Sequence, residues 1–571
     1  MTLRSCALGL ALLALASCWA MPLKMLYGEG GSYYTFAVIG DEMIYANRMQ
    51  ALPAGATIQN PLNGVCDPSV ISPYLLEDVV RELVTLSGLH IITVFWIWRF
   101  AFPILLLGSL YLLAKAALPG RLASWPVVLI AASAIQALYF LVYALIVPYP
   151  PMGGWLLRIP TNVEYPLAAL CGAAMCRFAL SRNPRWGLLS GLALAALLYL
   201  RPYSGMPWAM TAFLAMLLML FRRELQPRTA ALVAAALLGS LLPLVFIIVH
   251  NGALQSYRET MLRYFEPVEY RVHPGAIAFC VIGLLFAIAS RRVQRRFRAL
   301  LYASAAVMFV LPFISGLPKS MRNELLSFDR YTPFYFTMLG IVPCLVLHRI
   351  RVPGRVWTPA LACTMLVLAG LTLRHGTYDY STYYCGHYGA LQADLPSLRG
   401  YAWLREKTPP DTLVLNDERI HWGTVGATHW SDHLRATWIE DLFQVASHRR
   451  PVYHWRMYGS FMTHEQFAEL VFLQRATFGM ELKDEASADR VYAKLLAWYK
   501  PGYVFWRKGS PGLRGRGERL RKIATVEYAD DACEIWKLNY PERVMQDPGM
   551  ALPENLMLPA ARPQPEIKEP R

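Results

Sequence analysis

Long apolar blocks alternate with short polar connections over the first two thirds of the chain. Runs of about 18 or more apolar residues with few charges are long enough to cross a bilayer as helices. We therefore predict roughly eleven membrane-spanning helices. The blocks cover residues 5–22, 100–118, 125–147, 163–181, 186–200, 205–221, 229–250, 275–290, 299–316, 332–347 and 357–373.

The connections between these blocks alternate in character. Every second one is short and basic, as in "RRVQRRFR" at 291–298 and "HRIRVPGR" at 348–355, whereas the others are mixed in charge. Because cytoplasmic loops carry the excess of Lys and Arg, this pattern places the N-terminus in the cytoplasm and the chain after residue 374 outside. A competing interpretation is a cleaved signal peptide with a lipoprotein-like "LASC" site at 15–18. Either outcome leaves residue 23 onward outside.

Two outer regions are large enough to form structure of their own. The loop 23–99 is too long for a simple connector. Its second half predicts one or two helices along the membrane surface, with Trp96 and Trp98 at headgroup depth. Further on, residues 401–417 predict a helix, a turn and a short strand, and residues 523–538 predict two strands around an Asp-Asp turn.

These patterns predict a mainly α-helical fold with three parts. Residues 1–375 form a polytopic membrane helix bundle, and residues 376–540 form an extracytoplasmic α/β domain. The tail at 541–571 is rich in Pro and polar residues, which is typical of disorder.

The composition agrees with a membrane protein. Of the 571 residues, 55% are hydrophobic and 16% are charged, whereas soluble proteins of this size carry about a quarter charged residues. The net charge of +16 does not indicate a nucleic-acid partner, because the Arg residues lie in short clusters between apolar blocks and form no continuous basic face.

Cysteine and histidine give weaker signals. There is no CxxC motif; Cys66, Cys385 and Cys533 face outside in the predicted topology, which allows one disulfide. His429 and His433 would share a helical face with metal-ligand spacing, but Gly423 and Gly426 favour a loop. We therefore expect surface polar residues there, with no cofactor; a divalent metal is the alternative.

Acidic residues lie where the outer ends of the predicted spans meet water. "GDEMIYANRMQ" at 40–50 places Asp41 and Glu42 after the first apolar block, and Glu164 precedes the fourth span. Taken singly, Asp41 and Glu42 would form a solvated acidic turn, and Glu164 would cap its helix at the membrane interface. Arg201 lies in a very short outer turn, where it either snorkels to lipid headgroups or binds a phosphate group.

Together, these acids and cations match a lipid-linked sugar phosphate. Its polyprenyl chain would lie in the bilayer, its phosphate would meet Arg, and its sugar would project toward the carboxylates. A carboxylate would remove the acceptor hydroxyl proton as general base, while Arg stabilises negative charge on the leaving phosphate.

The same stretches resemble the GT-C glycosyltransferases of the protein-mannosyltransferase and aminoarabinose-transferase type. "GDEMIYANRMQ" is similar to their Asp-Glu-x-x-Tyr stretch, and "DRYTPFYFTMLGIVP" to their Arg-Tyr-x-x-Pro start of a late span. The resemblance covers about residues 1–375. It implies inverting transfer from a polyprenyl-phosphate sugar, with Asp41 as base and Glu164 as second acid. The substrate-binding residues it implies are Glu42, Tyr45, Arg201, Arg330 and Tyr331.

Two positions depart from that family. Several relatives carry Asp where this chain has Glu164, and they often carry Lys where it has Arg201. The sugar and the roles of these two residues therefore stay open.

The expected partners are the polyprenyl-phosphate-sugar donor, membrane lipids, and a glycan, lipid or protein acceptor, with the enzyme in a bacterial inner membrane. A transporter or flippase of a lipid-linked glycan is an alternative, as is a non-catalytic assembly protein. A transporter would place ionisable residues near the middle of several spans. Here the charges gather at the outer rim, which favours the enzyme.

Overall fold

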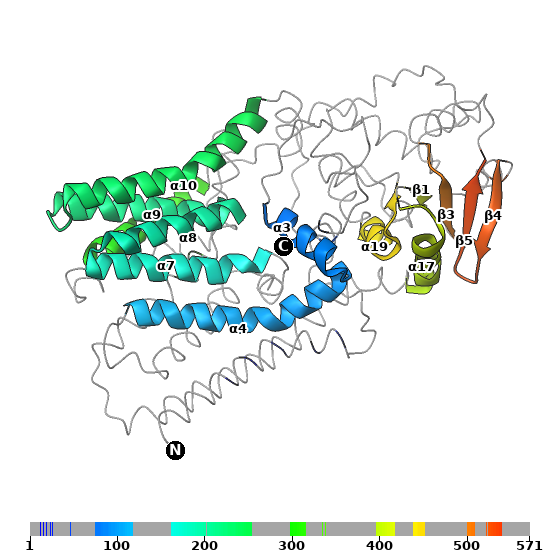
Figure 1. The fold of residues 1–571 in the computed structure, drawn as a ribbon, viewed down its shortest axis with the longest axis horizontal. Coiled ribbons are helices and arrows are strands. Elements are labelled where there is room, and N and C mark those ends of the chain that lie inside the picture. The colour runs from blue at the N-terminus through cyan, green and yellow to red at the C-terminus, as the bar shows by residue number, and fades with distance from the viewer. Residues whose placement is uncertain are drawn as a thin grey trace, which may run out of the picture.

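In the computed structural model, the described residues are mainly helical and form one small sheet (Figure 1). Among these residues, two helical segments, Ile91–Ala117 and Ser204–Phe221, are long and apolar enough to cross a membrane. The structure describes residues 75–117, 161–200, 202–253, 297–315, 395–410, 412–416, 438–451, 500–508, 521 and 523–539, together with the single residues 12, 15, 19, 23, 26, 46, 49, 334 and 337.

A bundle of apolar helices occupies one end of the molecule, where α4 and α7 to α10 lie side by side (Figure 1). Helix α4 packs on α7, α7 on α8, α8 on α10, and α9 on α13. Apart from the start of α4, the bounds fall close to the predicted apolar blocks, because long apolar runs favour helices of that length. They are α4 Ile91–Ala117, α7 Glu164–Ser181, α8 Pro184–Leu200, α9 Pro202–Phe221, α10 Pro227–Ala253 and α13 Arg298–Ser315.

Three of these helices run in the same direction. The Trp98 indole N–H near the start of α4 donates to Asn162 Oδ1, just before α7, at 2.7 Å. Near the other end, Arg177 Nη2 of α7 donates to the Lys115 carbonyl of α4 at 3.3 Å. The start of α9 meets the start of α7 through Ser204 and Glu164. Near its other end, Met219 of α9 accepts a hydrogen bond from Arg182, directly after α7, so α4, α7 and α9 are mutually parallel.

The two ends of this parallel group differ in charge. We call them the Glu164 end, where α4, α7 and α9 begin, and the basic end, where they finish. The described part of the basic end holds one carboxylate, Glu224, which is paired with Arg182. The cations there are Lys115, Arg177, Arg182, Arg185, Arg222, Arg223 and Arg228.

Many leucines on the outside of the bundle face away from the protein. Leu192 of α8 is 68% exposed and Leu242 of α10 is 66% exposed. Exposed apolar side chains on several neighbouring helices are typical of a surface that meets lipid.

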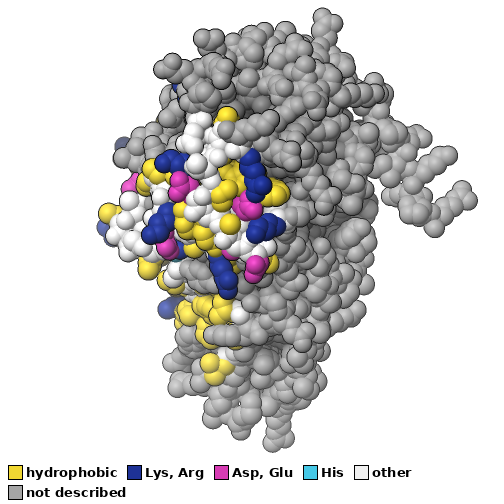
Figure 2. Space-filling view, turned by 90° about the vertical axis from the view of Figure 1, so that its right-hand side faces the viewer, with side chains coloured by type: hydrophobic (Ala, Val, Ile, Leu, Met, Phe, Trp, Pro, Cys, Tyr) yellow, Lys and Arg dark blue, Asp and Glu magenta, His cyan; other side chains and the backbone are white. Residues whose placement is uncertain are grey.

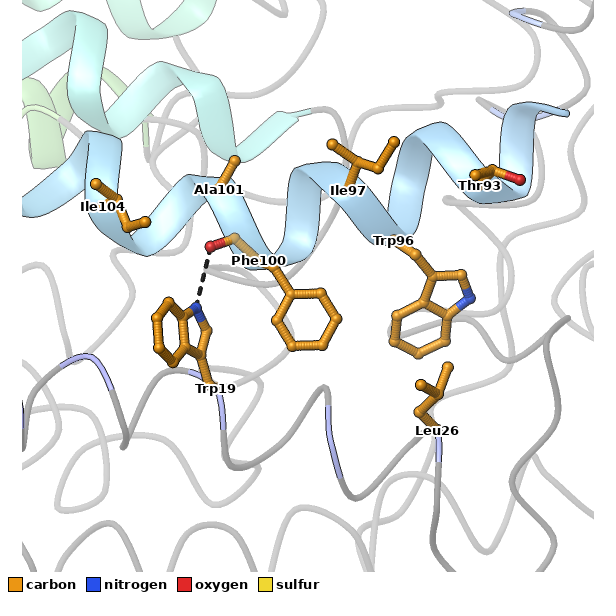
Figure 3. A pocket seen from close by; sticks show the side chains of 8 residues that line it. All are labelled: Trp19, Leu26, Thr93, Trp96, Ile97, Phe100, Ala101 and Ile104. Carbon is orange, nitrogen blue, oxygen red and sulfur yellow. Dashed lines mark hydrogen bonds between the residues drawn. The ribbon is translucent and has the colours of Figure 1, made fainter. Parts of the chain in front are cut away.

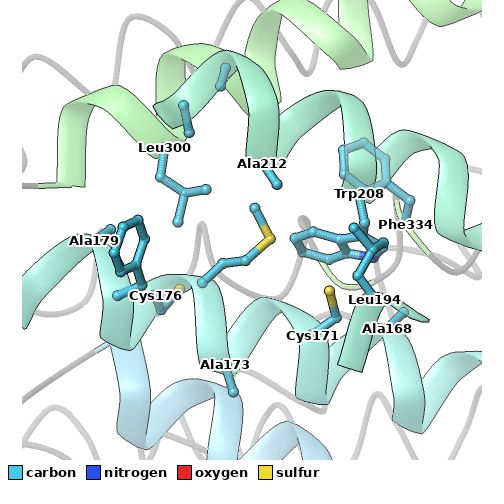
Figure 4. Packing of buried hydrophobic residues seen from close by; sticks show 14 of the residues in the cluster. Ala168, Cys171, Ala173, Cys176, Ala179, Leu194, Trp208, Ala212, Leu300 and Phe334 are labelled. Carbon is cyan, nitrogen blue, oxygen red and sulfur yellow. The ribbon is translucent and has the colours of Figure 1, made fainter. Parts of the chain in front are cut away.

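Trp208 of α9 is the largest side chain in the middle of the bundle and is fully buried (Figure 4). Its ring meets that of Phe334 edge to face, with centroids 5.1 Å apart. We expect Trp208→Ala to lower the stability of the bundle by about 3–5 kcal/mol, because it leaves a cavity that packed helices cannot refill.

Thermal unfolding of the full chain in detergent checks this expectation. Trp208→Phe is the matched control: the Trp208 indole nitrogen has no hydrogen-bond partner in the described part of the chain, so Phe removes volume without removing such a bond. A Trp208→Ala protein that melts with the wild type would contradict the packing.

The structure corrects the expectation for the end of the first outer loop. Helix α3, Leu75–Ser87, is separate and amphipathic as predicted, but residues 91–99 continue into the apolar helix as one α4. The break falls earlier because Gly88 has a φ of +66°, which favours glycine and ends a helix. Trp96 is buried, and the Trp98 indole donates to Asn162, so both side chains contact protein; their position at headgroup depth stays a prediction.

A mixed five-stranded sheet forms the other end of the molecule (Figure 1). The strand order is β2-β1-β3-β5-β4; β1 is parallel to β2 and β3, and β5 is antiparallel to β3 and β4. The elements are α17 Leu398–Lys407, β1 Leu413–Asn416, α19 Trp438–Ser447, β2 Arg450–Pro451, β3 Tyr503–Arg507, β4 Ala524–Ala529 and β5 Cys533–Leu538.

The Asp-Asp turn between β4 and β5 forms as predicted. Asp530 Oδ1 accepts the backbone N–H groups of Ala532 and Cys533, both at 2.8 Å, which is the local bonding that favours Asp in turns. Tyr528 donates to the other oxygen of Asp530 at 2.7 Å. The parallel pair β1 and β2 is joined through α19, as parallel strands require.

The sheet end and the start of α4 share one hydrophobic core. Phe95 and Ile92 of α4 belong to the same buried cluster as Tyr401, Phe443 and Phe505 of the sheet end. The sheet end therefore lies at the Glu164 end of the bundle. Figure 2 shows that its described outer face mixes Lys and Arg with Asp and Glu, as a water-exposed surface does.

Candidate functional site

Glu164 is the first residue of α7. A helix N-terminus carries partial positive charge from its unsatisfied N–H groups, so it stabilises a carboxylate. Val163, which precedes the helix, makes no side-chain capping bond, and Glu164 is the acidic residue of the first turn. Its side chain is half-buried.

Ser204, on the first turn of α9, holds this carboxylate. Its hydroxyl is fully buried and donates to Glu164 Oε2. The neighbouring Gly205 makes the contact feasible: a Cβ there would lie 2.6 Å from Leu198 Cδ2 and 3.0 Å from Leu198 Cα. Only glycine lets α9 start so close to the end of α8, and this approach brings Ser204 to Glu164.

Asn162 and Trp98 fix the segment leading into α7. Asn162 is fully buried in the short 3-10 turn Thr161–Val163, and its side-chain oxygen accepts the Trp98 N–H at 2.7 Å. Burying an amide without partners is costly, so this bond locks the approach to Glu164 against α4. We call Trp98, Asn162, Glu164 and Ser204 the Glu164 cluster.

Arg99 lies beside the cluster, on the inward stripe of α4. It is 1% exposed, between Phe95 and Phe102 on the same helix face, and its guanidinium carbon lies 4.5 Å from the centre of the Trp96 ring. Because α4 and α7 run parallel from the Trp98–Asn162 contact, Arg99 lies at about the level of Glu164. A cation this deep in an apolar helix marks a functional position.

One of the seven predicted site residues falls within the described part of the chain. Glu164 is at the bundle end as expected, but its hydrogen-bonding partner is Ser204, which the sequence did not single out. Asp41, Glu42, Tyr45, Arg201, Arg330 and Tyr331 lie outside the described residues. Their roles stay predictions.

Several other sequence-based expectations also fall outside that part. They include His429, His433, Cys66 and Cys385. Cys533 is described and is a buried thiol at the start of β5. The described residues contain no group of three His, Cys, Asp or Glu side chains that would hold a metal.

Asn162, Ser204 and Arg99 were not predicted as site residues. Ser204 and Asn162 carry no signal in sequence, because a buried serine or asparagine looks like any loop residue until its partner is known. Arg99 carries a signal in the sequence, because it interrupts the apolar run "IITVFWIWRFAF". An Arg on the apolar stripe of a helix predicts a buried charge.

An apolar groove of about 680 Å³ runs along another face of α4 (Figure 3). Its lining residues are Trp19, Leu26, Thr93, Trp96, Ile97, Phe100, Ala101 and Ile104. The Trp19 indole N–H donates to the Phe100 carbonyl at 3.0 Å. This donor is therefore occupied, and the groove offers few polar groups to a ligand. It suits apolar chains and is not a reaction centre.

No protein-family model matches the chain, and no curated protein matches its sequence. Among solved structures, the chain is similar to the apo form of the Archaeoglobus fulgidus oligosaccharyltransferase, with 11% identity and a TM-score of 0.42 over 88% of this chain and 69% of that one.

The Glu164 cluster holds a fixed carboxylate, and the buried Arg99 directly follows Trp98 of the cluster in α4. Such a site can accept hydrogen bonds from hydroxyl groups and can take a proton from one of them. Its position at the end of an apolar bundle, beside a water-exposed domain, gives it access to a substrate that is apolar at one end and polar at the other.

Proposed function

We propose that this chain is a membrane glycosyltransferase that moves a sugar from a polyprenyl-phosphate-linked donor to an acceptor at the outer face of the membrane. The observation that carries the proposal is the Glu164 carboxylate, which is held by buried Ser204 where apolar helices meet the sheet domain. Such a junction suits a donor with a lipid tail and a sugar head.

The orientation follows from charge. The basic end of the described bundle carries seven cations and one carboxylate, and cationic ends of membrane helices lie in the cytoplasm. The Glu164 end and the sheet domain are then extracytoplasmic. About eleven spans in a bacterial inner membrane complete this arrangement.

The acidic motif belongs at the same end of the bundle. Ala46 and Met49 are helical, fully buried and part of the cluster that includes Phe95 and Trp96 of α4. Ala46 lies four residues after Glu42 in the sequence. The proposed site therefore combines the Asp41–Glu42 pair with Glu164.

The proposed reaction is a single inverting displacement at the anomeric carbon. The acceptor oxygen attacks that carbon while its proton passes to Asp41, and the bond from carbon to phosphate oxygen breaks. The polyprenyl phosphate leaves with the bonding electron pair. Arg201 and Arg330 offset its growing charge, and Glu164, Glu42, Tyr45 and Tyr331 bind the sugar and acceptor hydroxyls.

The distribution of charge favours this enzyme over a transporter. In the described helices the ionisable side chains lie at the level of Glu164 and Arg99 or close to a helix end, and the middle of each helix is apolar. A transporter would place such groups near the middle of its spans.

Mass spectrometry of the lipids and envelope glycans of a strain lacking the gene tests the proposal. We expect one glycan or lipid to lose a sugar and its polyprenyl-phosphate donor to accumulate. A flippase would instead leave the complete lipid-linked glycan on the cytoplasmic leaflet. An unchanged glycan and lipid profile would reject the proposed function.

A further inference from the structure

Two histidines meet where the sheet domain contacts the bundle. His90 directly precedes α4, and His448 directly follows α19. Their ring centres are 4.8 Å apart and the rings are tilted by 35°. The contact joins segments more than 350 residues apart and lies at the shared core of Ile92, Phe95 and Phe443.

Both rings are held in place by their backbones. His90 Nδ1 accepts the Ile92 N–H at 3.2 Å and so caps the start of α4. His448 has a φ of +54°, a left-handed conformation that few residues other than Gly, Asn and Asp adopt readily. The His448 Nε2 atom is buried and has no hydrogen-bond partner in the described part of the chain.

Two guanidinium groups act on this pair. The positive charge of Arg405 in α17 lowers the pKa of both rings, and that of Arg449 lowers the pKa of His448. Arg449 cannot swing away, because it donates to Thr408 Oγ1 at 2.7 Å, to the Arg405 carbonyl at 2.7 Å and to the His448 carbonyl at 2.9 Å. A proton added to either ring would meet like charges in a buried contact.

We propose that His90 and His448 form a pH-sensitive latch, which holds the sheet domain on the start of α4 at neutral pH and loosens this contact in acid. The latch is independent of the sugar-transfer proposal. It concerns an interface that also contains Ala46 and Met49 of the acidic segment, so its opening would loosen that segment as well.

The direction follows from the pKa values of the two states. Burial lowers the pKa of His448 to about 3, with further lowering by His90, Arg405 and Arg449. Burial and Arg405 also lower the pKa of His90, against a backbone hydrogen bond to Val445. In the open state both rings would have the ordinary pKa of about 6.5. The contact is therefore fully stable above that pH and weakens as the pH falls toward the lower values.

The expected size is about tenfold per pH unit for each ring that takes up a proton only when the contact opens. Between pH 7.5 and pH 5.0 this gives an increase in opening of about 30-fold for one ring and about 900-fold for both. Hydrogen exchange of the full-length protein in nanodiscs, corrected for intrinsic exchange, measures the effect. Peptides covering 91–96 and 443–449 should open in acid, while the β5 peptide 533–538 should not.

Asparagine is the matched replacement at both positions. In His448→Asn it tolerates the left-handed backbone, and in His90→Asn its side-chain oxygen can still cap α4. We expect the double variant to keep the wild-type exchange at pH 7.5 and to lose the acid opening. Acid opening that persists in the double variant, or equal exchange at both pH values in the wild type, would overturn the latch.

If the double variant folds poorly, a second variant tests the latch. Arg405→Gln keeps both rings but removes a charge that lowers their pKa in the closed contact. The acid opening should therefore begin at the same pH, level off at a higher pH and reach a smaller maximum than in the wild type. A maximum opening equal to that of the wild type would count against the latch. Opening of β5 together with the contact would also count against it, because that result indicates acid unfolding of the whole domain.

Discussion

Replacing Asp41 by Asn is expected to lower sugar transfer by about 10²–10⁴-fold, the range that a positioned general base contributes. The amide has nearly the same shape but cannot take up the acceptor proton. The measurement is product formation by purified protein with a polyprenyl-phosphate sugar, once mass spectrometry of the gene-deficient strain has identified the sugar.

Glu42→Gln is the matched control, because it makes the same change at the next residue. A substrate-binding role predicts a higher KM with a smaller loss of kcat. If Asp41→Asn forms product at the wild-type rate, Asp41 is not the base, even if the chain is a glycosyltransferase.

Glu164→Gln should lower transfer by about 10²-fold, and Ser204→Ala by about tenfold. Removing a hydrogen bond to a charged group costs about 1.5–3 kcal/mol, and tenfold in rate corresponds to about 1.4 kcal/mol. Ser204 acts through Glu164, so its loss should be the smaller one. Once Glu164 is already Gln, adding Ser204→Ala should have little further effect.

Arg177→Gln at the basic end is the control for general damage to the bundle, and it should leave the rate unchanged. Full activity in both Glu164→Gln and Ser204→Ala would contradict a role in transfer and would indicate that the Glu164 cluster only caps α7.

Local sequence signals predicted much of the fold. The block at 163–181 became α7, Glu164–Ser181, because an apolar run of that length has few alternatives to a helix. The hairpin at 524–538 formed because Asp530 supplies its own turn bonds. The single helix from Ile91 to Ala117 was missed, because a left-handed glycine at 88 outweighed the change in hydropathy near residue 100.

The candidate site was predicted only in part, because its partners are distant in sequence. Glu164 was found from its place before an apolar run, but Ser204 lies 40 residues away, and no local pattern connects the two. The contact of His90 with His448 depends on how the sheet end packs against α3 and α4. Such packing depends on shape and volume, which single-residue patterns do not encode.

The shared core of the sheet end and α4 has a consequence for how this chain can diverge. Phe443 and Val445 of α19 are fully buried against residues that belong to the bundle. Exchanging the C-terminal region for that of a distant homologue would expose both surfaces unless α3 and α4 were exchanged with it. The unit of modular inheritance in this protein is therefore discontinuous along the gene.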